Sequence, residues 1–176
     1  EIRGAGRLQV LQALGVPIRV GKNDIEVRGV GLNGFKQPEK ELYCGNSGTT
    51  MRLMSGILAG QPFESVLTGD ASLTKRPMKR VTDPLREMGA EISGPDNGNF
   101  PPLRIKGGNL QGIYFDNKLS SAQVKSALMF AGLFAQGETV IREELLSRDH
   151  TENLFKYFQA DFERTEDSVI VRPSKK

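Results

Sequence analysis

The chain has 176 residues and a formal net charge of +3, with 24 lysine and arginine residues against 21 aspartate and glutamate residues. This length is typical of one domain and is enough to bury a core. The small, dispersed charge and the absence of tryptophan argue against a nucleic-acid surface, which needs a basic stripe or a base-stacking platform. No apolar run approaches the roughly 18 residues of a membrane span, so neither nucleic acid nor a membrane is an expected partner.

The single cysteine, Cys44, excludes an internal disulfide and fits a reducing compartment, so we expect a cytoplasmic protein. The chain begins at Glu1 rather than at methionine, and it opens directly into a helical pattern. We therefore expect this start to be a cut made by design or by proteolysis.

One pattern occurs three times along the chain: an amphipathic helix, a small-residue stop, a short strand, a tight turn and an alternating strand. Its copies cover residues 7–30, 78–106 and 151–172. The second and third copies share an upstream part, in which a helix at 49–58 or at 121–135 lies between two short strands. These strands are expected at 41–43, 64–67, 112–115 and 139–143. Each full unit is therefore β-α-β-α-β-β, and the first copy lacks its opening β-α-β.

The two longer helices are apolar on nearly all sides, which is typical of helices that are buried on most faces. Three units that pack such helices inward and place their sheets outside would form one pseudo-threefold body. The sequence therefore predicts an α+β fold of repeated β-α-β-α-β-β units with buried helices and outer sheets. We expect one domain over residues 1–176, with a partial first unit at 1–34, a second unit at 35–108 and a third at 109–176.

A short turn at residues 44–53 contains two glycines, three hydroxyl residues, an amide and an arginine, and it leads into an apolar helix. Free backbone N–H groups, glycines that permit close approach and a fixed positive charge are what an anion site at a helix start requires. A second cluster at 67–78 places Arg76 before Pro77 at a helix start, where a cation opposes the helix dipole. Together the two stretches predict a binding surface for phosphate or carboxylate.

These motifs also have purely structural interpretations. Residues 45–52 could be a tight turn with a helix cap, since Asn, Ser and Thr are favoured at that position. Ser121 and Gln123 could be a plain N-terminal cap with a polar first turn. Lys125 is either a solvated neighbour on that helix or an ion-pair partner.

Other polar residues point to no separate chemistry. Asp70 follows a glycine and is expected to form a turn. The run from Asp149 to Glu152 has a spacing that suits zinc poorly, and we expect it to cap a helix start. No Gly-x-x-x-x-Gly-Lys-Ser/Thr occurs in the sequence, which excludes a P-loop nucleotide binder.

Four motifs resemble the EPSP synthase (3-phosphoshikimate 1-carboxyvinyltransferase) family in their order and spacing along essentially the whole chain. They are residues 45–52, residues 67–70 followed by 76–78, residues 120–127 and residues 147–152. The last two resemble the branch that carries Ser-Ala-Gln and Arg-Asp-His-Thr-Glu. The related UDP-N-acetylglucosamine carboxyvinyltransferases share the fold, but the sequences of their glycine and arginine motifs are different.

The resemblance implies a reaction in which phosphoenolpyruvate and 3-phosphoshikimate give 5-enolpyruvylshikimate-3-phosphate and phosphate, a step of the shikimate pathway toward chorismate and the aromatic amino acids. It implies two similar domains, each of three β-α-β-α-β-β units, that close over the substrates. This chain would then be a fragment that covers most of the N-terminal domain of a two-domain enolpyruvyl transferase.

On the phosphoenolpyruvate side, the resemblance assigns Gly48, with Asn46 beside it, to the turn against which phosphoenolpyruvate and the inhibitor glyphosate lie. Arg76 matches an arginine that binds phosphoenolpyruvate. Thr49 and Arg52 are expected to shape the turn. Because residue 48 is glycine, the intact enzyme is expected to be a glyphosate target that is sensitive to the inhibitor.

On the 3-phosphoshikimate side, Ser121, Ala122 and Gln123 match the stretch that holds this substrate, and Gln123 is expected to reach phosphoenolpyruvate as well. Arg148 matches a shikimate-side arginine of the Arg-Asp-His branch, and Ser147 lies next to it.

The resemblance also implies what this chain lacks. The Lys-Ser…Arg motif of the family would precede Glu1, and its catalytic aspartate and glutamate would follow Lys176. We therefore expect no catalytic residue, cofactor or metal site in this chain, and no turnover without the other domain, because a closed cleft needs groups from both sides. The alternative hypothesis is a non-catalytic, repeat-built binding or scaffold domain whose glycine turns are structural.

Overall fold

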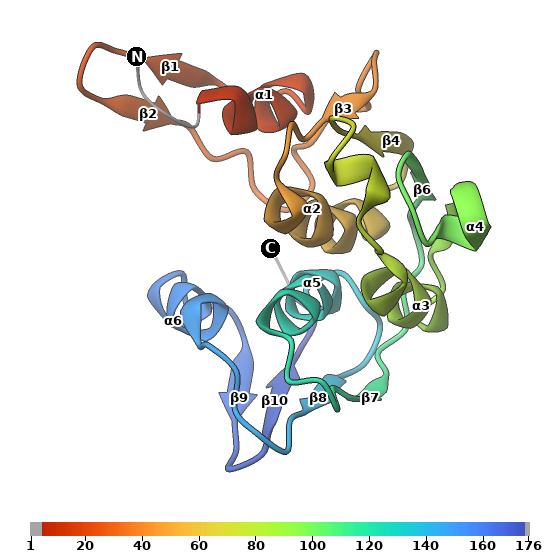
Figure 1. The fold of residues 1–176 in the computed structure, drawn as a ribbon. Coiled ribbons are helices and arrows are strands. Elements are labelled where there is room, and N and C mark those ends of the chain that lie inside the picture. The colour runs from red at the N-terminus through yellow and green to blue at the C-terminus, as the bar shows by residue number, and fades with distance from the viewer. Residues whose placement is uncertain (1–4, 175–176) are drawn as a thin grey trace.

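The computed structural model describes residues 5–174, and helices and strands alternate along them (Figure 1). The α-helices are α1 (Ala5–Ala13), α2 (Gly48–Ala59), α3 (Lys79–Glu87), α4 (Pro95–Gly98), α5 (Ala122–Gly132) and α6 (His150–Tyr157), with one 3-10 turn, η1 (Leu73–Lys75). The strands are β1 (Ile18–Val20), β2 (Ile25–Val27), β3 (Leu42–Tyr43), β4 (Glu64–Thr68), β5 (Glu91–Ser93), β6 (Leu103–Lys106), β7 (Tyr114–Asp116), β8 (Thr139–Arg142), β9 (Phe162–Arg164) and β10 (Ser168–Val171). No helix among these residues is both long and apolar enough to cross a membrane.

Two four-stranded sheets share one topology, in the orders β3-β4-β6-β5 and β7-β8-β10-β9. In each sheet the first pair of strands is parallel and the other neighbours are antiparallel. A parallel pair needs a crossover connection, which α2 provides in the first sheet and α5 in the second. The predicted α+β class and the β-α-β-α-β-β order of the second and third copies are confirmed.

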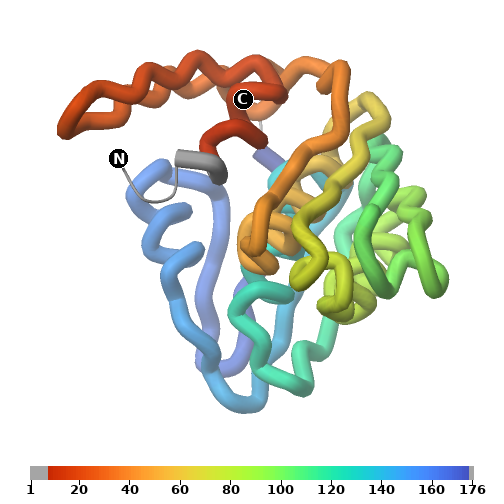
Figure 2. The backbone as a smooth tube through the Cα atoms, turned by 45° about the horizontal axis from the view of Figure 1, so that its top comes forward, coloured from red at the N-terminus to blue at the C-terminus, as the bar shows by residue number. Residues whose placement is uncertain are grey.

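The first copy contributes only α1 and the antiparallel hairpin β1–β2, in which Ile18 pairs with Val27. Within the described residues no strand pairs with the other edge of β2, whereas its counterparts β6 and β10 each have a second neighbour. The hairpin extends from the body of the molecule (Figures 1 and 2). Residues 1–4 and 175–176 lie outside the described residues, and the unit boundaries at 34 and 108 remain predictions.

Helices α2 and α5 pack against each other in the middle of the molecule, with the sheets to the outside (Figure 1). Their backbones approach closely at Gly56, where an added Cβ would lie 2.0 Å from the carbonyl oxygen of Ala127. The side chains of Met51, Leu58 and Leu128 are fully buried. The expectation that the two longer helices are buried is therefore confirmed, and their adjacent N-termini place the polar turns next to each other.

Candidate anion-binding site

The glycine turn begins α2 with a side-chain cap. Ser47 is the N-cap residue, and its Oγ accepts hydrogen bonds from the Thr50 N–H at 3.1 Å and from Thr50 Oγ1 at 2.8 Å. Gly48 is the first helical residue and is buried. The first N–H groups of a helix have no intrahelical acceptor and carry partial positive charge, so this end of α2 favours an anion.

Two guanidinium groups approach the Cα atom of Gly48. A Cβ added at this position would lie 2.9 Å from Arg52 Nη1 and 3.5 Å from Arg76 Nη1. Gly48 starts a regular helix, so the reason for glycine here is space rather than an unusual backbone conformation. The missing side chain keeps the surface between the two arginines open.

Arg76 is held by a side chain of the turn before α2 and by the side chain of the residue before η1. Its Nη2 donates to Asn46 Oδ1 at 2.5 Å and to Ser72 Oγ at 3.4 Å, and Asn46 Nδ2 donates to Asp70 Oδ2 at 2.8 Å. Hydrogen bonds to Asp70 from the Leu73 backbone N–H and from Asn46 lower the pKa of Asp70. The predicted turn-forming role of Asp70 is confirmed, and this carboxylate also orients the amide that holds Arg76.

Gln123 connects the start of α5 to the start of α2. Its Oε1 accepts from Arg52 Nη1 at 2.7 Å, and its Nε2 donates to Thr49 Oγ1 at 2.8 Å. Arg52 Nη2 donates to the carbonyl oxygen of Pro77 at 3.0 Å. One amide thus joins two motifs that are more than seventy positions apart in the sequence.

Within the described residues, the positive guanidinium groups of Arg52 and Arg76 are hydrogen-bonded to neutral groups rather than paired with carboxylates. The acceptors of Arg52 and Arg76 are amide, hydroxyl and backbone carbonyl oxygens. Among residues 5–174 neither guanidinium lies within ion-pairing distance of a carboxylate. Burial, followed by the like charges of Arg80 and Arg76, lowers the pKa of Arg52. A bound anion would relieve this repulsion.

A hollow of about 430 Å³ lies beside this turn, at the start of α5. It is lined by Ser120, Ser121, Ala122, Gln123, Leu146, Ser147 and Arg148. None of the described residues that line it carries a carboxylate, and Arg148 is exposed. Within the described part of the chain, no hydrogen bond or ion pair engages the Arg148 side chain. Since Gln123 lines this hollow and also contacts Arg52, the two positive regions form one continuous surface.

The structure therefore brings all the sequence-predicted site residues together. Asn46, Gly48 and Arg76 surround the first positive region, and the other five line the hollow. Their role in binding stays a prediction. The turn-shaping role expected for Arg52 is incomplete, because Arg52 also forms part of the surface and holds Gln123. Its position four residues after Gly48, on the same face of α2, was the available signal.

A buried ion cluster lies behind the hollow. Lys125 is fully buried and pairs with Glu143 at 3.1 Å and with Glu152 at 2.6 Å, so Lys125 is an ion-pair partner rather than a solvated neighbour. The expected capping network at the start of α6 is wrong, because the N-cap residue Asp149 makes no side-chain capping bond. Glu152 binds Lys125 and Arg164 instead.

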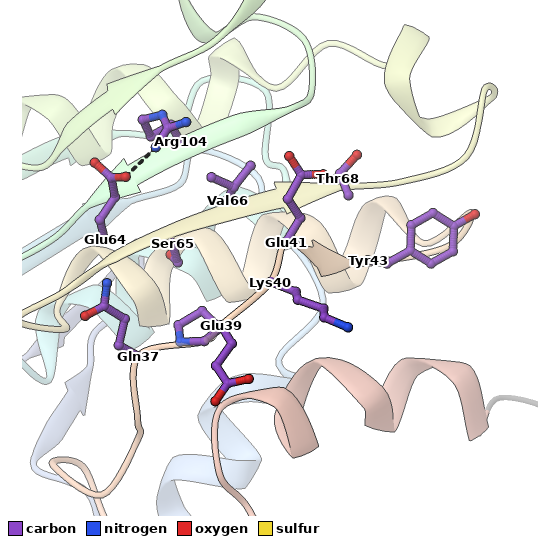
Figure 3. Close-up of a pocket in the computed structure, with 11 residues that line it drawn as sticks. Gln37, Glu39, Lys40, Glu41, Tyr43, Glu64, Ser65, Val66, Thr68 and Arg104 are labelled. Carbon is purple, nitrogen blue, oxygen red and sulfur yellow. Dashed lines mark hydrogen bonds and ion pairs between the residues drawn. The ribbon is translucent and has the colours of Figure 1, made fainter.

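A larger hollow of about 700 Å³ lies on the outer side of the first sheet, beside β3 and β4 (Figure 3). Its charged lining consists of three carboxylates, on Glu39, Glu41 and Glu64, and two cations, on Lys40 and Arg104. Glu64 and Arg104 already form an ion pair with each other (Figure 3). This balance of charges disfavours an anionic ligand, so the smaller hollow beside Gln123 is the better candidate site.

A family model for EPSP synthase (3-phosphoshikimate 1-carboxyvinyltransferase) matches residues 6–176. The chain belongs to the EPSP synthase family. The family expectation drawn from the four motifs is therefore confirmed.

Curated relatives agree with this membership of the EPSP synthase family. The 3-phosphoshikimate 1-carboxyvinyltransferase of Bacillus cytotoxicus is 52% identical over 159 residues, which cover 90% of this chain and 38% of that protein. The protein of the same name from Persephonella marina is 53% identical over 172 residues, covering 96% of this chain and 40% of that protein. The chain thus spans about two fifths of the length of these EPSP synthase relatives.

Solved structures agree as well. The EPSP synthase from Acinetobacter baumannii superposes with a TM-score of 0.93 at 45% sequence identity, covering 98% of this chain and 39% of that one. The enolpyruvyl transferase NikO from Streptomyces tendae superposes with a TM-score of 0.69 at 11% identity, which shows a shared fold. The EPSP synthase fold therefore extends over nearly the whole of this chain.

Proposed function

We propose that this chain supplies half of the substrate site of a transferase that moves the enolpyruvyl group of phosphoenolpyruvate to 3-phosphoshikimate. The products are 5-enolpyruvylshikimate-3-phosphate and phosphate. The observation that carries the proposal is one surface with two positive regions that share Gln123. Two adjoining anion sites suit two phosphorylated reactants that must lie side by side before they react.

The region around Gly48 is the proposed site for phosphoenolpyruvate, and for glyphosate as an inhibitor. Arg76 and Arg52 supply fixed positive charge, and the absence of a Cβ at Gly48 lets a small dianion approach the start of α2. Asn46 orients Arg76 through its side-chain oxygen. These contacts support assigning Asn46, Gly48 and Arg76 to this substrate, with Arg52 as an addition.

The hollow at the start of α5 is the proposed site for 3-phosphoshikimate. Its volume of about 430 Å³ falls within the range of small-molecule sites. Arg148 provides a cation for a phosphate group, and Ser121, Ala122 and Gln123 form the other wall. Ser147 precedes Arg148 and also lines the hollow.

The chain alone is proposed to have no turnover. Stabilising the transition state requires groups that converge from both sides of a dry, closed cleft, and the catalytic carboxylates are proposed to lie in another domain of the same enzyme. That domain is the proposed partner, in addition to the two small-molecule substrates, and no cofactor is invoked. A cytoplasmic location is proposed because the one cysteine, Cys44, is buried and unpaired.

Titration of the ¹⁵N-labelled chain with 3-phosphoshikimate tests the proposal. With only this chain's half of the site present, few charge-assisted contacts offset the ordering and desolvation costs. We expect a dissociation constant no better than roughly 1 mM, or about 4 kcal/mol, with amide shifts at Ser121, Gln123 and Arg148. Phosphoenolpyruvate alone is expected to be nearly unbound. Undisturbed spectra at several times this concentration would favour the non-catalytic scaffold.

A further inference from the structure

Three buried polar side chains lie directly behind the hollow at the start of α5. Asn117, Lys125 and Glu143 are 3%, 0% and 2% exposed, respectively, and we refer to them as the Glu143 network. Burial of charged groups is costly unless each is paired and hydrogen-bonded. None of the three lines the hollow, so the network needs a reason other than direct contact with a ligand.

The network holds Ser147 at three atoms. Glu143 Oε1 accepts from Ser147 Oγ at 2.7 Å, and Glu143 Oε2 accepts from the Ser147 N–H at 3.1 Å. Lys125 Nζ donates to the Ser147 carbonyl oxygen at 3.4 Å and to Glu143 Oε2 at 3.1 Å. The residue before Arg148 is therefore fixed by two oppositely charged side chains that balance each other.

The same network holds Ser121, which lies on the other wall of the hollow. Asn117 Nδ2 donates to the Ser121 carbonyl oxygen at 3.1 Å, and Asn117 Oδ1 accepts from the Ser121 N–H at 3.3 Å. Asn117 Nδ2 also donates to Glu143 Oε1 at 2.8 Å. The two walls are thus tied to each other through one carboxylate.

Ser121 and Ser147 differ in whether their hydroxyl groups can donate a hydrogen bond to a ligand. Ser147 Oγ gives its proton to Glu143, so it has none left for a phosphate, whose oxygens are acceptors. Among the described residues no hydrogen bond engages Ser121 Oγ, although the Ser121 backbone is held. Ser121 Oγ is therefore free to donate to a ligand, whereas Ser147 serves to place Arg148.

We propose that Glu143, supported by Asn117 and Lys125, is a positioning residue: it fixes Ser121 and the residue before Arg148, so that Ser121 and Arg148 keep their places in the hollow proposed for a phosphate monoester of a small ring. This inference rests on the proposed function. Because the positive charge of Lys125 offsets that of the carboxylate, the network presents little net charge to the ligand, and the positive charge of Arg148 is preserved. Loss of the carboxylate lets the two walls move apart.

Glu152 offers a matched control. It is also a buried carboxylate, 4% exposed, and it pairs with the same lysine nitrogen at 2.6 Å. Its other partner is Arg164 at 3.1 Å, and within the described residues it bonds to neither Ser121 nor Ser147. E143Q and E152Q therefore remove the same charge from Lys125, but only E143Q disturbs the tie between the walls.

The experiment compares the wild-type chain with E143Q and E152Q in ¹⁵N titrations with 3-phosphoshikimate, with urea unfolding measured in parallel. For E143Q we expect the initial slope of the Arg148 amide shift against ligand concentration to fall about tenfold. For E152Q it should stay within about twofold, although both variants lose stability. If E143Q does not fold, E143D replaces it with the same expectation, because it keeps the charge but shortens the reach.

Failure of the positioning role and failure of the proposed function would give different titration results. Equal slopes in all three proteins, or equal losses in both variants, would overturn the positioning role and leave the proposed function intact. A wild-type chain whose amides do not respond to 3-phosphoshikimate would overturn the proposed function and this inference with it.

Discussion

At the scale of single residues, the candidate anion-binding site depends on the lack of a side chain at Gly48. Gly48 leaves room between Arg52 and Arg76 at the start of α2. The sequence could predict this turn, since glycines and hydroxyl residues before an apolar helix are local signals. It could not predict the bond from Arg52 to Gln123, because no local pattern reports a contact between residues so far apart.

Gly48→Ala tests the importance of this space. The added Cβ meets the ends of two flexible side chains rather than backbone, so the free energy of unfolding should change by no more than about 1 kcal/mol. With saturating 3-phosphoshikimate present, the amide shifts that phosphoenolpyruvate causes at Thr49 should become much smaller. The response of Arg148 to 3-phosphoshikimate should remain. Unchanged shifts with phosphoenolpyruvate would show that this space is not its site.

At the scale of elements, sequence periodicity located the longer helices and the strands, but it located neither the short helix α4 nor the ends of the elements. The helix predicted at 121–135 ends at Gly132, and the strand predicted at 112–115 lies at Tyr114–Asp116. Apolar side chains continue past the last helical turn and into the strand approaches, so the pattern does not mark a boundary. The burial of Lys125 could not be predicted either, because its partners lie elsewhere in the chain: Glu143 follows β8, and Glu152 is in α6.

The contact between α2 and α5 should be intolerant of a single methyl group. In Gly56→Ala the new Cβ would lie 2.0 Å from the Ala127 carbonyl oxygen, so the two helices must move apart. We expect a loss of about 1–3 kcal/mol in the free energy of unfolding in urea. Gly29→Ala is the control, because no atom of residues 5–174 lies within 4 Å of its added Cβ. A Gly56→Ala protein as stable as the Gly29→Ala protein would contradict this packing.

The Glu143 carboxylate should make stability depend on pH. Burial alone would raise its pKa, but hydrogen bonds from Ser147 and Lys125 outweigh burial and lower the pKa of Glu143 below its ordinary value of 4.5. The stabilisation by the ionised form is therefore complete above that value and is lost as the pH falls through the lowered pKa of the folded state. Urea midpoints measured from pH 6 downward should fall more steeply for the wild type than for E143Q. Parallel curves would contradict this linkage.

At the scale of the whole molecule, repetition explains why polar turns converge. Two sheets of the same topology surround two adjacent helices, so the starts of α2 and α5 fall at the same end of the body, where Gln123 joins them. The repeated units could be predicted from the sequence, since helix and strand periods recur at a nearly constant spacing. The apolar faces also predicted that the helices pack inside the sheets, but they could not predict where α2 and α5 approach each other most closely, at Gly56.

One measurement tests the central claim that a single surface holds two adjoining anion sites. The ¹⁵N-labelled chain is titrated first with 3-phosphoshikimate and then, in its presence, with phosphoenolpyruvate. The first ligand should shift the amides of Ser121, Gln123 and Arg148, and the second should add shifts at Gly48 and Thr49. Shifts confined to the hollow beside β3 and β4, or scattered over both sheets, would contradict the account.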